Sequence, residues 1–455
     1  MELEVVMYNP DRLRRLEMSR GIRSSGASAA SFHSRNRRLV RRTVVAMRVA
    51  IEHGGLWASN QDADTTVTGR GGCSTRRQNE WPFPARRARR SAVFISAEAI
   101  MRIGIPRETK TLEGRVALVP AACADLVNRG HEVWIEKDAG VKSGFSDAEY
   151  TAVGVNIAPD AAALYEKGEM IVKVKEPIAG DLQHLRKDHL LFCYLHLAAE
   201  PELTRKLLDI GLTGIAFETV ELDNGDLPLL APMSIIAGRI ATQIGTHLLH
   251  MPAGGKGLLL GGLPSTERGR VVVLGAGAAG GNSAQLAAAG GANVVVFEKR
   301  QDRMAQMMAL GANVTALYPY AETVARELAR ADLVIGAVLV TGARAPHVVS
   351  REMVSGMQPG SVMVDISVDQ GGCFETTRPT TYADPTYVVD DVTHFAVTNM
   401  PGAVPRTSSQ AICAAILPFV SKLADGGWRD NQPLVRGINV EDCRLVHPAL
   451  QDMNV

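Results

Sequence analysis

The sequence lacks the features that mark disulfide-bonded, secreted and membrane-spanning proteins. Its six cysteines are scattered over 455 residues without a CxxC pair, which argues against a disulfide framework. No run approaches the ~18 uninterrupted apolar residues that a spanning helix needs. No charged segment leads into a short apolar run after Met1, as it would in a secretory signal. We therefore expect a cytoplasmic protein with reduced thiols and no membrane partner.

Lysine is missing from residues 1–100, although this segment contains 18 arginines and 9 acidic residues. Its formal charge is therefore +9, while residues 101–455 carry −8. The segment shows little periodicity and combines Ser/Gly-rich patches with Arg clusters, which favours disorder. The mildly acidic remainder offers no basic surface for nucleic acid, so we expect no nucleic-acid partner.

Three interpretations of residues 1–100 remain open. Arginine without lysine suggests translated GC-rich upstream sequence that is dispensable or not native. An Arg- and Ser-rich segment also suits an organelle transit peptide, although its nine acidic residues oppose this. The third interpretation is a basic arm that binds a partner. Because the composition and periodicity of the sequence change at Met101, where an apolar strand meets a loop, we expect the functional chain to start there.

From Met101 onward the sequence alternates strand-like and helical segments. The runs HEVWIE, EMIVKVKE, HLLFCYL and TGIAFETV alternate with the helical patterns PAACADLVNRG and PELTRKLLDIG, which predicts βαβ units and a parallel sheet. A long apolar-periodic stretch over residues 233–251 precedes a second series: RVVVLGAG, NVVVFE, VTALY, DLVIGAVL and SVMVDISV. The fold class is therefore α/β, with two doubly wound, Rossmann-like domains and a cleft between them.

Three regions follow from this pattern. Residues 1–100 form the extension, 101–230 a catalytic domain, and 231–404 a nucleotide-binding domain. The tail from Ser408 to Trp428 looks helical but is too short to form a domain. We expect residues 405–455 to pack back on the first domain and complete it.

A glycine motif follows the first strand of the second series. The buried-type strand over residues 271–274 leads into Gly275, Gly277 and Gly280, and a helix of small residues comes next. In a GxGxxG turn these glycines allow a tight turn, close approach of a pyrophosphate, and close helix packing. A glycine-rich turn that binds nothing is the alternative. The strand–turn–helix context favours a dinucleotide site.

The next strand in the sequence ends in Glu298, eighteen residues after Gly280. A carboxylate there binds a ribose 2′-hydroxyl and repels a 2′-phosphate, so the sequence favours NAD over NADP. Lys299 and Arg300 are adjacent and could tolerate a 2′-phosphate, which leaves the choice between the two cofactors less secure than the fold.

Polar residues after apolar strands are candidate ligand contacts, because open α/β sheets bind ligands at the carboxyl ends of their strands. Arg115, in the loop after the first strand, could hold a carboxylate through two parallel hydrogen bonds, or it could be a solvated loop residue. In IVKVKEP, strand alternation predicts Lys173 and Lys175 on one face, with Lys175 nearest the carboxyl end. A solvated pair is the alternative.

Two further candidates are titratable. His196 ends the apolar run LLFCYLH and could act as an acid or base near neutral pH, or it could be a structural histidine. Asp369 follows SVMVDISV and precedes two glycines, so its alternative role is to stabilise that turn. Asp365, inside the strand, is the competing carboxylate. Together the four residues suit dehydrogenation of a small amino or hydroxy acid.

These blocks resemble, in order, those of the alanine dehydrogenase family over nearly all of residues 101–455: MRIGIPRETK, EGRVAL, KVKEP, LHLAA, LLAPMS, VLGAGAAG, DLVIGAVL, VDISVDQGGCFE and NMPGAVP. The related transhydrogenase α-subunit shares the opening IGIPRE and the glycine motif. The combination of KVKEP with LHLAA favours the dehydrogenase.

The resemblance implies NAD-dependent interconversion of L-alanine with pyruvate and ammonia. It implies that Arg115 and Lys175 hold the substrate carboxylate and carbonyl, and that His196 is the acid/base. Asp369 would assist addition and loss of water or ammonia, and Asn399 would lie near the substrate and nicotinamide.

The resemblance also places Ser234 at the pyrophosphate and Val338 and Leu339 beside the nicotinamide, and it implies a homohexamer. Ile235 stands where an acidic residue is expected, and the segment after Arg444 is short, so we expect no metal site. Two other functions remain open: a transhydrogenase subunit that works with a membrane partner, and a non-enzymatic NAD-binding regulator.

Overall fold

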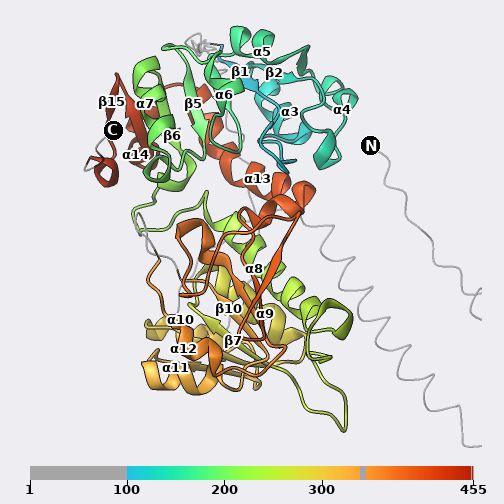
Figure 1. Ribbon diagram of the computed structural model, residues 1–455. Coiled ribbons are helices and arrows are strands. Elements are labelled where there is room, and N and C mark those ends of the chain that lie inside the picture. The colour runs from blue at the N-terminus through green and yellow to red at the C-terminus, as the bar shows by residue number, and fades with distance from the viewer. Residues whose placement is uncertain (1–99, 339–344, 452, 454–455) are drawn as a thin grey trace, which may run out of the picture. The chain divides into compact units, whose positions relative to one another are not determined.

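The computed structural model describes residues 100–338, 345–451 and 453. The extension predicted over residues 1–100 lies outside this range except for Ile100, and Leu339 also lies outside it. Within this range there are two sheets, each with helices packed against it (Figure 1). The predicted α/β class with two doubly wound sheets is therefore confirmed.

The first sheet has eight strands in the order β15-β14-β6-β5-β4-β1-β2-β3. The strands from β1 to β6 are parallel. All of them except the short β3 follow predicted apolar runs. Their bounds are β1 (Arg102–Ile105), β2 (Glu132–Glu136), β3 (Asn156–Ala158), β4 (Met170–Val172), β5 (Leu190–Cys193) and β6 (Thr213–Ala216). The helices of this part are α3 (Pro120–Asn128), α4 (Asp147–Thr151), α5 (Ala161–Lys167), α6 (Ala179–Leu182) and α7 (Pro201–Ile210).

The second sheet has seven strands in the order β12-β13-β11-β10-β7-β8-β9. The strands are β7 (Arg270–Leu274), β8 (Asn293–Phe297), β9 (Val314–Leu317), β10 (Leu333–Gly336), β11 (Val362–Asp365), β12 (Thr386–Val389) and β13 (Val392–Phe395). The helices are α8 (Ala231–Leu248), α9 (Ala278–Ala289), α10 (Gln301–Met308), α11 (Ala321–Leu328) and α12 (Arg351–Ser355).

Both sheets are mixed rather than purely parallel, which the sequence patterns did not predict. At one edge of the first sheet, β14 (Ile438–Glu441) and β15 (Arg444–Leu445) are antiparallel, and at one edge of the second, β12 pairs antiparallel with β13. The hairpin turns contain Asp390 and Asp391 in one case and Asp442 and Cys443 in the other, all with positive φ. Two positive φ values match the right-handed twist of the strands, but aspartate and cysteine give a weaker turn signal than Asn-Gly.

The tail joins the two sheets. Helix α13 (Pro405–Ala424), orange-red in Figure 1, packs on α3 of the first part and on α8 of the second. After α14 (Gln432–Arg436), β14 pairs with β6 of the first sheet. A single hydrophobic cluster accordingly contains Val133 from the first sheet, Val271 from the second, and Ile240 and Ile416 from these long helices.

The approach of α8 to α9 depends on a glycine. A Cβ on Gly238 would lie 2.0 Å from the carbonyl oxygen of Ala279, so no other residue fits without separating the helices. The close contact is stabilised by Ser283, whose Oγ donates to the Gly238 carbonyl at 2.7 Å. Helix α8 thereby fixes the first turn of α9, which follows the glycine motif.

Candidate active site

Both sheets have a topological switch point, and the predicted site residues follow the strands beside it. In the first sheet the order reverses between β1 and β4, and in the second between β7 and β10. Ligands bind outside the carboxyl ends of such strands. The loop after β1 carries Arg115, the segment after β4 carries Lys175, and the turn after β7 carries the glycine motif.

Arg115 is buried and paired, so the alternative of a solvated loop arginine is wrong. Its side chain is 2% exposed. Its Nε donates to Glu113 Oε1 at 2.7 Å, and its Nη2 donates to Glu113 Oε2 and, at 2.8 Å, to Asn399 Oδ1. Nη1 faces Met233 Sδ at 3.2 Å. The Nε/Nη2 edge, which usually grips a carboxylate in parallel bonds, is therefore taken by Glu113.

The pair is ionised over the whole working range of pH. Burial opposes the charge on Glu113, but hydrogen bonds and the positive charge of Arg115 outweigh it and lower the pKa of Glu113 to about 2. Burial likewise opposes the charge on Arg115, yet Glu113 raises the pKa of Arg115. Asn399, in the left-handed region at φ 59°, also donates to Glu113 from Nδ2 at 3.1 Å. The cluster thus links a loop of the first sheet to one that follows β13.

Lys173 and Lys175 do not share a strand face, contrary to the alternation argument. β4 ends at Val172, and Lys173 is buried between Glu108 Oε2 at 3.3 Å and Asp181 Oδ2 at 3.1 Å. Burial opposes the charge on Lys173, but these two carboxylates raise its pKa. Lys175 is half-buried. The buried lysine is therefore structural, and Lys175 remains the candidate for substrate.

The Lys175 segment is fixed by its backbone. Glu108 Oε1 accepts from Val174 N at 2.6 Å and from Lys175 N at 3.3 Å. The Val174 carbonyl accepts from Tyr194 N at 3.1 Å, which ties this segment to the one after β5. Burial raises the pKa of Glu108, and the positive charge of Lys173 acts against that rise.

His196 lies three residues beyond the end of β5, with φ 50° in the left-handed region. Its side chain is 40% exposed. Its ring stacks on Tyr194 with centroids 5.6 Å apart and planes 7° apart. Glu218 accepts from His196 N at 2.6 Å, and its Oε1 lies 4.0 Å from His196 Nδ1. Glu218 therefore fixes the backbone of His196 and places a carboxylate beside its ring.

Tyr194 stacks on His196 and lies within reach of the Arg115 charge. Burial raises the pKa of Tyr194, and the nearby Arg115 charge opposes that rise. The hydroxyl donates to the Leu229 carbonyl at 2.6 Å, just before α8. Arg115, Lys175 and His196 thus all follow strands at the carboxyl edge of the first sheet, and Asn399 reaches Arg115 from the loop after β13.

The two candidate carboxylates after β11 differ in their surroundings. Asp365 is buried and accepts from Ser367 N at 2.8 Å, from Cys373 N at 2.9 Å and from Thr377 Oγ1 at 2.5 Å. Burial raises the pKa of Asp365 against those hydrogen bonds. Asp369 is exposed on the 3₁₀ turn Ile366–Gln370 that Asp365 caps. Asp365 therefore stabilises the turn, and Asp369 remains accessible. No contact in the described residues joins Asp369 to Arg115 or His196.

The glycine turn has the geometry that a dinucleotide requires. Gly275 has φ 94°, and a Cβ on Gly280 would lie 1.8 Å from the Gly275 carbonyl oxygen. A Cβ on Gly277 would meet no atom nearer than Arg303 Nη1 at 3.9 Å, so that side is open. Gly277 precedes α9, whose first backbone N–H groups suit a phosphate.

Two other predicted cofactor contacts lie within the described range. Ser234 is half-buried in the first turn of α8, and Val338 is half-buried two residues after the end of β10. Leu339 lies outside the described residues. Val338 therefore follows the strand beside the glycine turn, since β7 and β10 are neighbours.

Glu298 follows β8, and both of its carboxylate oxygens accept hydrogen bonds from backbone N–H groups. Its Oε2 accepts from Ala276 N at 3.0 Å, and Oε1 accepts from Lys299 N at 2.7 Å and Arg300 N at 3.0 Å. Burial opposes ionisation, but these bonds lower its pKa. Glu298 is therefore an anion beside the glycine turn.

The sequence analysis missed three carboxylates that hold the candidate residues: Glu108, Glu113 and Glu218. Only the EGR spacing of Glu113 and Arg115 gave a local signal. The other contacts join residues from separate loops, as between Glu108 and Val174.

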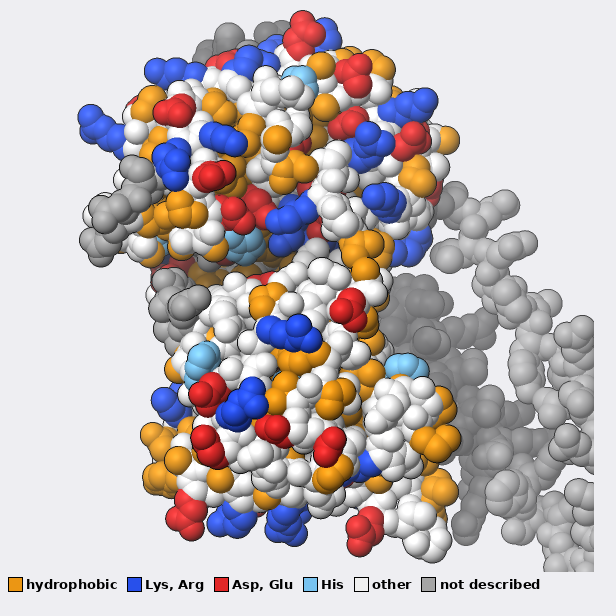
Figure 2. Space-filling view, viewed as in Figure 1, with side chains coloured by type: hydrophobic (Ala, Val, Ile, Leu, Met, Phe, Trp, Pro, Cys, Tyr) orange, Lys and Arg blue, Asp and Glu red, His pale blue; other side chains and the backbone are white. Residues whose placement is uncertain are grey.

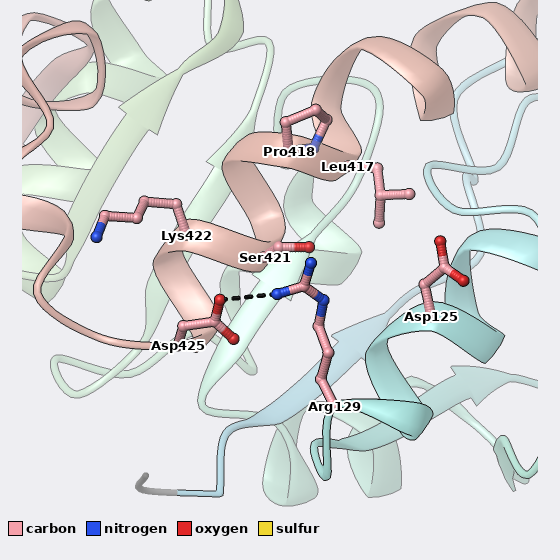
Figure 3. Close-up of a pocket in the computed structure, with 7 residues that line it drawn as sticks. All are labelled: Asp125, Arg129, Leu417, Pro418, Ser421, Lys422 and Asp425. Atoms are coloured by element: carbon pink, nitrogen blue, oxygen red, sulfur yellow. Dashed lines mark hydrogen bonds and ion pairs between the residues drawn. The ribbon is translucent and has the colours of Figure 1, made fainter. Parts of the chain in front are cut away.

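A groove between α3 and α13 is lined by a mixture of charged and apolar side chains, among them the pair Arg129 and Asp425 (Figure 3). On the face shown in Figure 2, cationic and anionic side chains are interspersed rather than gathered by sign. The described part of the chain contains no cluster of three potential metal ligands, and none of its helices is long and apolar enough to span a membrane.

Comparisons with known proteins cover the residues of both sheets. The alanine dehydrogenase/PNT N-terminal domain matches residues 104–237, and the corresponding C-terminal domain matches residues 241–448. Alanine dehydrogenase from Halomonas elongata is 47% identical over 357 residues, which cover 77% of this chain and 96% of that protein.

Comparison with solved structures leads to the same family. An L-alanine dehydrogenase matches with a TM-score of 0.75 and 48% identity, covering 77% of this chain and 98% of that one. A transhydrogenase from Sinorhizobium meliloti has a TM-score of 0.66 and 25% identity, covering 76% and 99%. On the strength of both domain matches and of relatives covered almost end to end, this chain belongs to the alanine dehydrogenase/PNT family.

Proposed function

We propose that the protein is an NAD-dependent alanine dehydrogenase. It converts L-alanine, NAD⁺ and water into pyruvate, ammonium, NADH and a proton, and it runs the reverse reductive amination. The observation that carries the proposal is the grouping of Arg115, Lys175 and His196 at one sheet edge, in a chain 47% identical to an alanine dehydrogenase.

Arg115 and Lys175 bind the substrate. The two N–H groups of Arg115 Nη1 have only Met233 Sδ as a partner among the described residues, so they are available to a substrate carboxylate. Lys175 supplies a second cation toward the carboxylate and the carbonyl oxygen of pyruvate. Asn399, held against Arg115 by its amide oxygen, orients the substrate from the second sheet.

His196 moves protons and Asp369 assists the addition of water. His196 accepts a proton from the substrate nitrogen or the attacking water, and Glu218 holds its backbone N–H at 2.6 Å. Asp369, exposed on the capped turn, orients the water that attacks the iminium carbon. Collapse of the resulting carbinolamine releases ammonia and leaves pyruvate.

NAD fits the turn after β7. Gly275, Gly277 and Gly280 leave room for a pyrophosphate, and Ser234 contacts it from α8. Glu298 binds the adenosine ribose, and Val338 with Leu339 lines the nicotinamide side. When bound, NAD⁺ accepts the hydride from the alanine Cα. The protein's own contribution is to hold Cα and nicotinamide together in a water-poor site.

The domain division and assembly belong to the same proposal. Residues 101–230 with 405–455 form the catalytic domain, residues 231–404 form the NAD-binding domain, and the two close over substrate as a hinge. The protein is a cytoplasmic homohexamer in pyruvate and alanine metabolism, with α8 at an interface. Residues 1–100 are dispensable, which is supported by family matches that begin at residue 104.

The test is NADH formation at alkaline pH with L-alanine, D-alanine, serine or no substrate, using the full chain and a version that starts at Met101. We expect turnover with L-alanine in both proteins. Absence of turnover in either direction from folded, NAD-binding protein would refute the dehydrogenase. Hydride exchange between dinucleotides without alanine turnover would instead indicate a transhydrogenase.

Substituting Glu298 with serine is expected to weaken discrimination against NADP. The ionised carboxylate repels a 2′-phosphate, so its removal shifts the ratio of kcat/KM for NAD and NADP toward NADP by about tenfold to hundredfold, the equivalent of roughly 1–3 kcal/mol. Glu322→Ser removes an exposed carboxylate from α11 and is the matched control. An unchanged ratio in Glu298→Ser would exclude Glu298 from the choice between the two cofactors.

A further inference from the structure

The Glu113 carboxylate has no acceptor position left for a substrate or a proton in transit. An ionised carboxylate offers about four acceptor positions. Oε1 accepts from Arg115 N at 3.0 Å and from Arg115 Nε at 2.7 Å, and Oε2 accepts from Arg115 Nη2 and from Asn399 Nδ2 at 3.1 Å. The side chain is fully buried. Glu113 is therefore committed to two residues that the proposed function assigns to substrate.

The same contacts determine which Arg115 hydrogens point elsewhere. Of five N–H groups, Nε uses one on Glu113, and Nη2 uses its two on Glu113 and Asn399. The guanidinium is planar and rigid, so fixing three of its hydrogens also fixes the direction of the two on Nη1. Met233 Sδ on α8 lies 3.2 Å from Nη1 and is the one partner of Nη1 among the described residues.

We propose that Glu113 is a positioning residue that sets the direction of the Arg115 guanidinium toward the substrate carboxylate and, through Asn399, ties that direction to the second sheet. This inference rests on the proposed function. Glu113 touches neither substrate nor cofactor; it acts through Arg115 and Asn399. The negative charge of Glu113 also offsets the positive charge of Arg115. Substrate binding therefore depends on the direction of the guanidinium and on the N–H groups of Nη1, rather than on a free Nε/Nη2 edge.

Glu113→Gln tests this role because it keeps the shape of the side chain and replaces one acceptor oxygen with an N–H donor. The glutamine Nε2 would face Arg115 Nη2 and Asn399 Nδ2, which are both donors, and the guanidinium would lose its alignment. We expect the KM for pyruvate to rise about tenfold or more, with NADH affinity and the pH dependence of kcat unchanged. Glu113→Asp, which keeps the charge but retracts it by one methylene, should fold and raise the KM in the same direction.

A swap variant separates positioning from simple support of the fold. In Glu113→Gln combined with Asn399→Asp, the carboxylate moves to position 399, where it accepts from Arg115 Nη2 and from the glutamine amide. Because Asn399 is itself assigned to the substrate, we expect this double variant to recover the melting temperature and part of the KM lost in Glu113→Gln. The control Glu136→Gln removes another buried carboxylate of the first sheet, which accepts from Arg107 N at 2.9 Å. It should lower the melting temperature without changing the KM for pyruvate.

Three outcomes would overturn the proposal. One is a KM for pyruvate within twofold of wild type in folded Glu113→Gln or Glu113→Asp. Another is a swap variant that recovers the melting temperature and none of the lost KM. The third is a control that raises the KM as much as Glu113→Gln does. Wild-type protein assayed in parallel must turn over L-alanine. Its failure to do so would refute the proposed function, whereas a normal wild type with unaffected variants would refute this inference alone.

Discussion

His196→Ala is expected to lower kcat for L-alanine oxidation by about 10²- to 10⁴-fold, the usual contribution of a positioned acid/base. NAD binding should persist, because the glycine turn after β7 does not contact His196. The measurement is kcat and KM in both directions together with the dissociation constant for NADH. A loss confined to KM would contradict an acid/base role and indicate a binding role.

The chain offers a matched control in His184. It stacks on Tyr165 with ring centroids 5.8 Å apart, much as His196 stacks on Tyr194, and it is also half-buried. His184→Ala should leave kcat within about twofold of wild type. If both variants lose activity equally, loss of ring stacking rather than loss of the imidazole would explain the effect.

Arg115→Met is expected to have the second large effect, on substrate affinity and on stability together. It removes the carboxylate contact and leaves Glu113 buried without its cation. Breaking a buried pair in this way costs about 3–5 kcal/mol. The KM for pyruvate should rise by about a hundredfold or more, and the melting temperature should fall by several degrees.

The loss of stability should depend on pH in a defined direction. In the wild type the pKa of Glu113 is lowered from 4.5 to about 2, so its stabilisation is complete above about pH 4.5 and disappears as the pH falls toward 2. Without Arg115, burial raises the pKa of Glu113 in the folded state. The penalty then begins near pH 4.5, where Glu113 ionises in the unfolded chain, and grows as the pH rises toward the raised pKa. The difference in melting temperature between the wild type and Arg115→Met should therefore be larger at pH 8 than at pH 5.

A surface arginine provides the comparison. Arg129 is 51% exposed and pairs with Asp425 at 3.0 Å in the groove of Figure 3. Exposed pairs contribute about 0–1 kcal/mol, so Arg129→Met should change neither KM nor the pH dependence of melting. A difference for Arg115→Met that stays constant from pH 5 to pH 8 would show that Glu113 does not carry the buried charge.

The parts of the fold with local signals were predictable from sequence. The glycine turn and the apolar runs that form β1, β2 and β4 to β11 depend on period, length and turn chemistry within a few residues. The three-residue β3 was not predicted. The antiparallel edges were not predictable, because β14 pairs with β6 across more than 200 residues. The Asp390–Asp391 turn uses residues that also occur in ordinary loops.

The residues of the candidate site were likewise predictable only where the signal was local. Arg115, His196 and Asp369 could be selected because they follow apolar strands, but their surroundings depend on tertiary contacts. Lys173 failed the alternation argument because its strand ends one residue earlier and two carboxylates from other segments bury it. Glu218 went unnoticed because its partner is a backbone N–H of a distant loop.

The most direct test of the account is hydride transfer itself. The full chain is incubated with NAD⁺ and L-alanine that carries deuterium at Cα, and the NADH is analysed by mass spectrometry. The account predicts NADH with one added deuterium, together with pyruvate and ammonia in equal amounts. NADH without deuterium, or no NADH from folded protein that binds NAD, would contradict it.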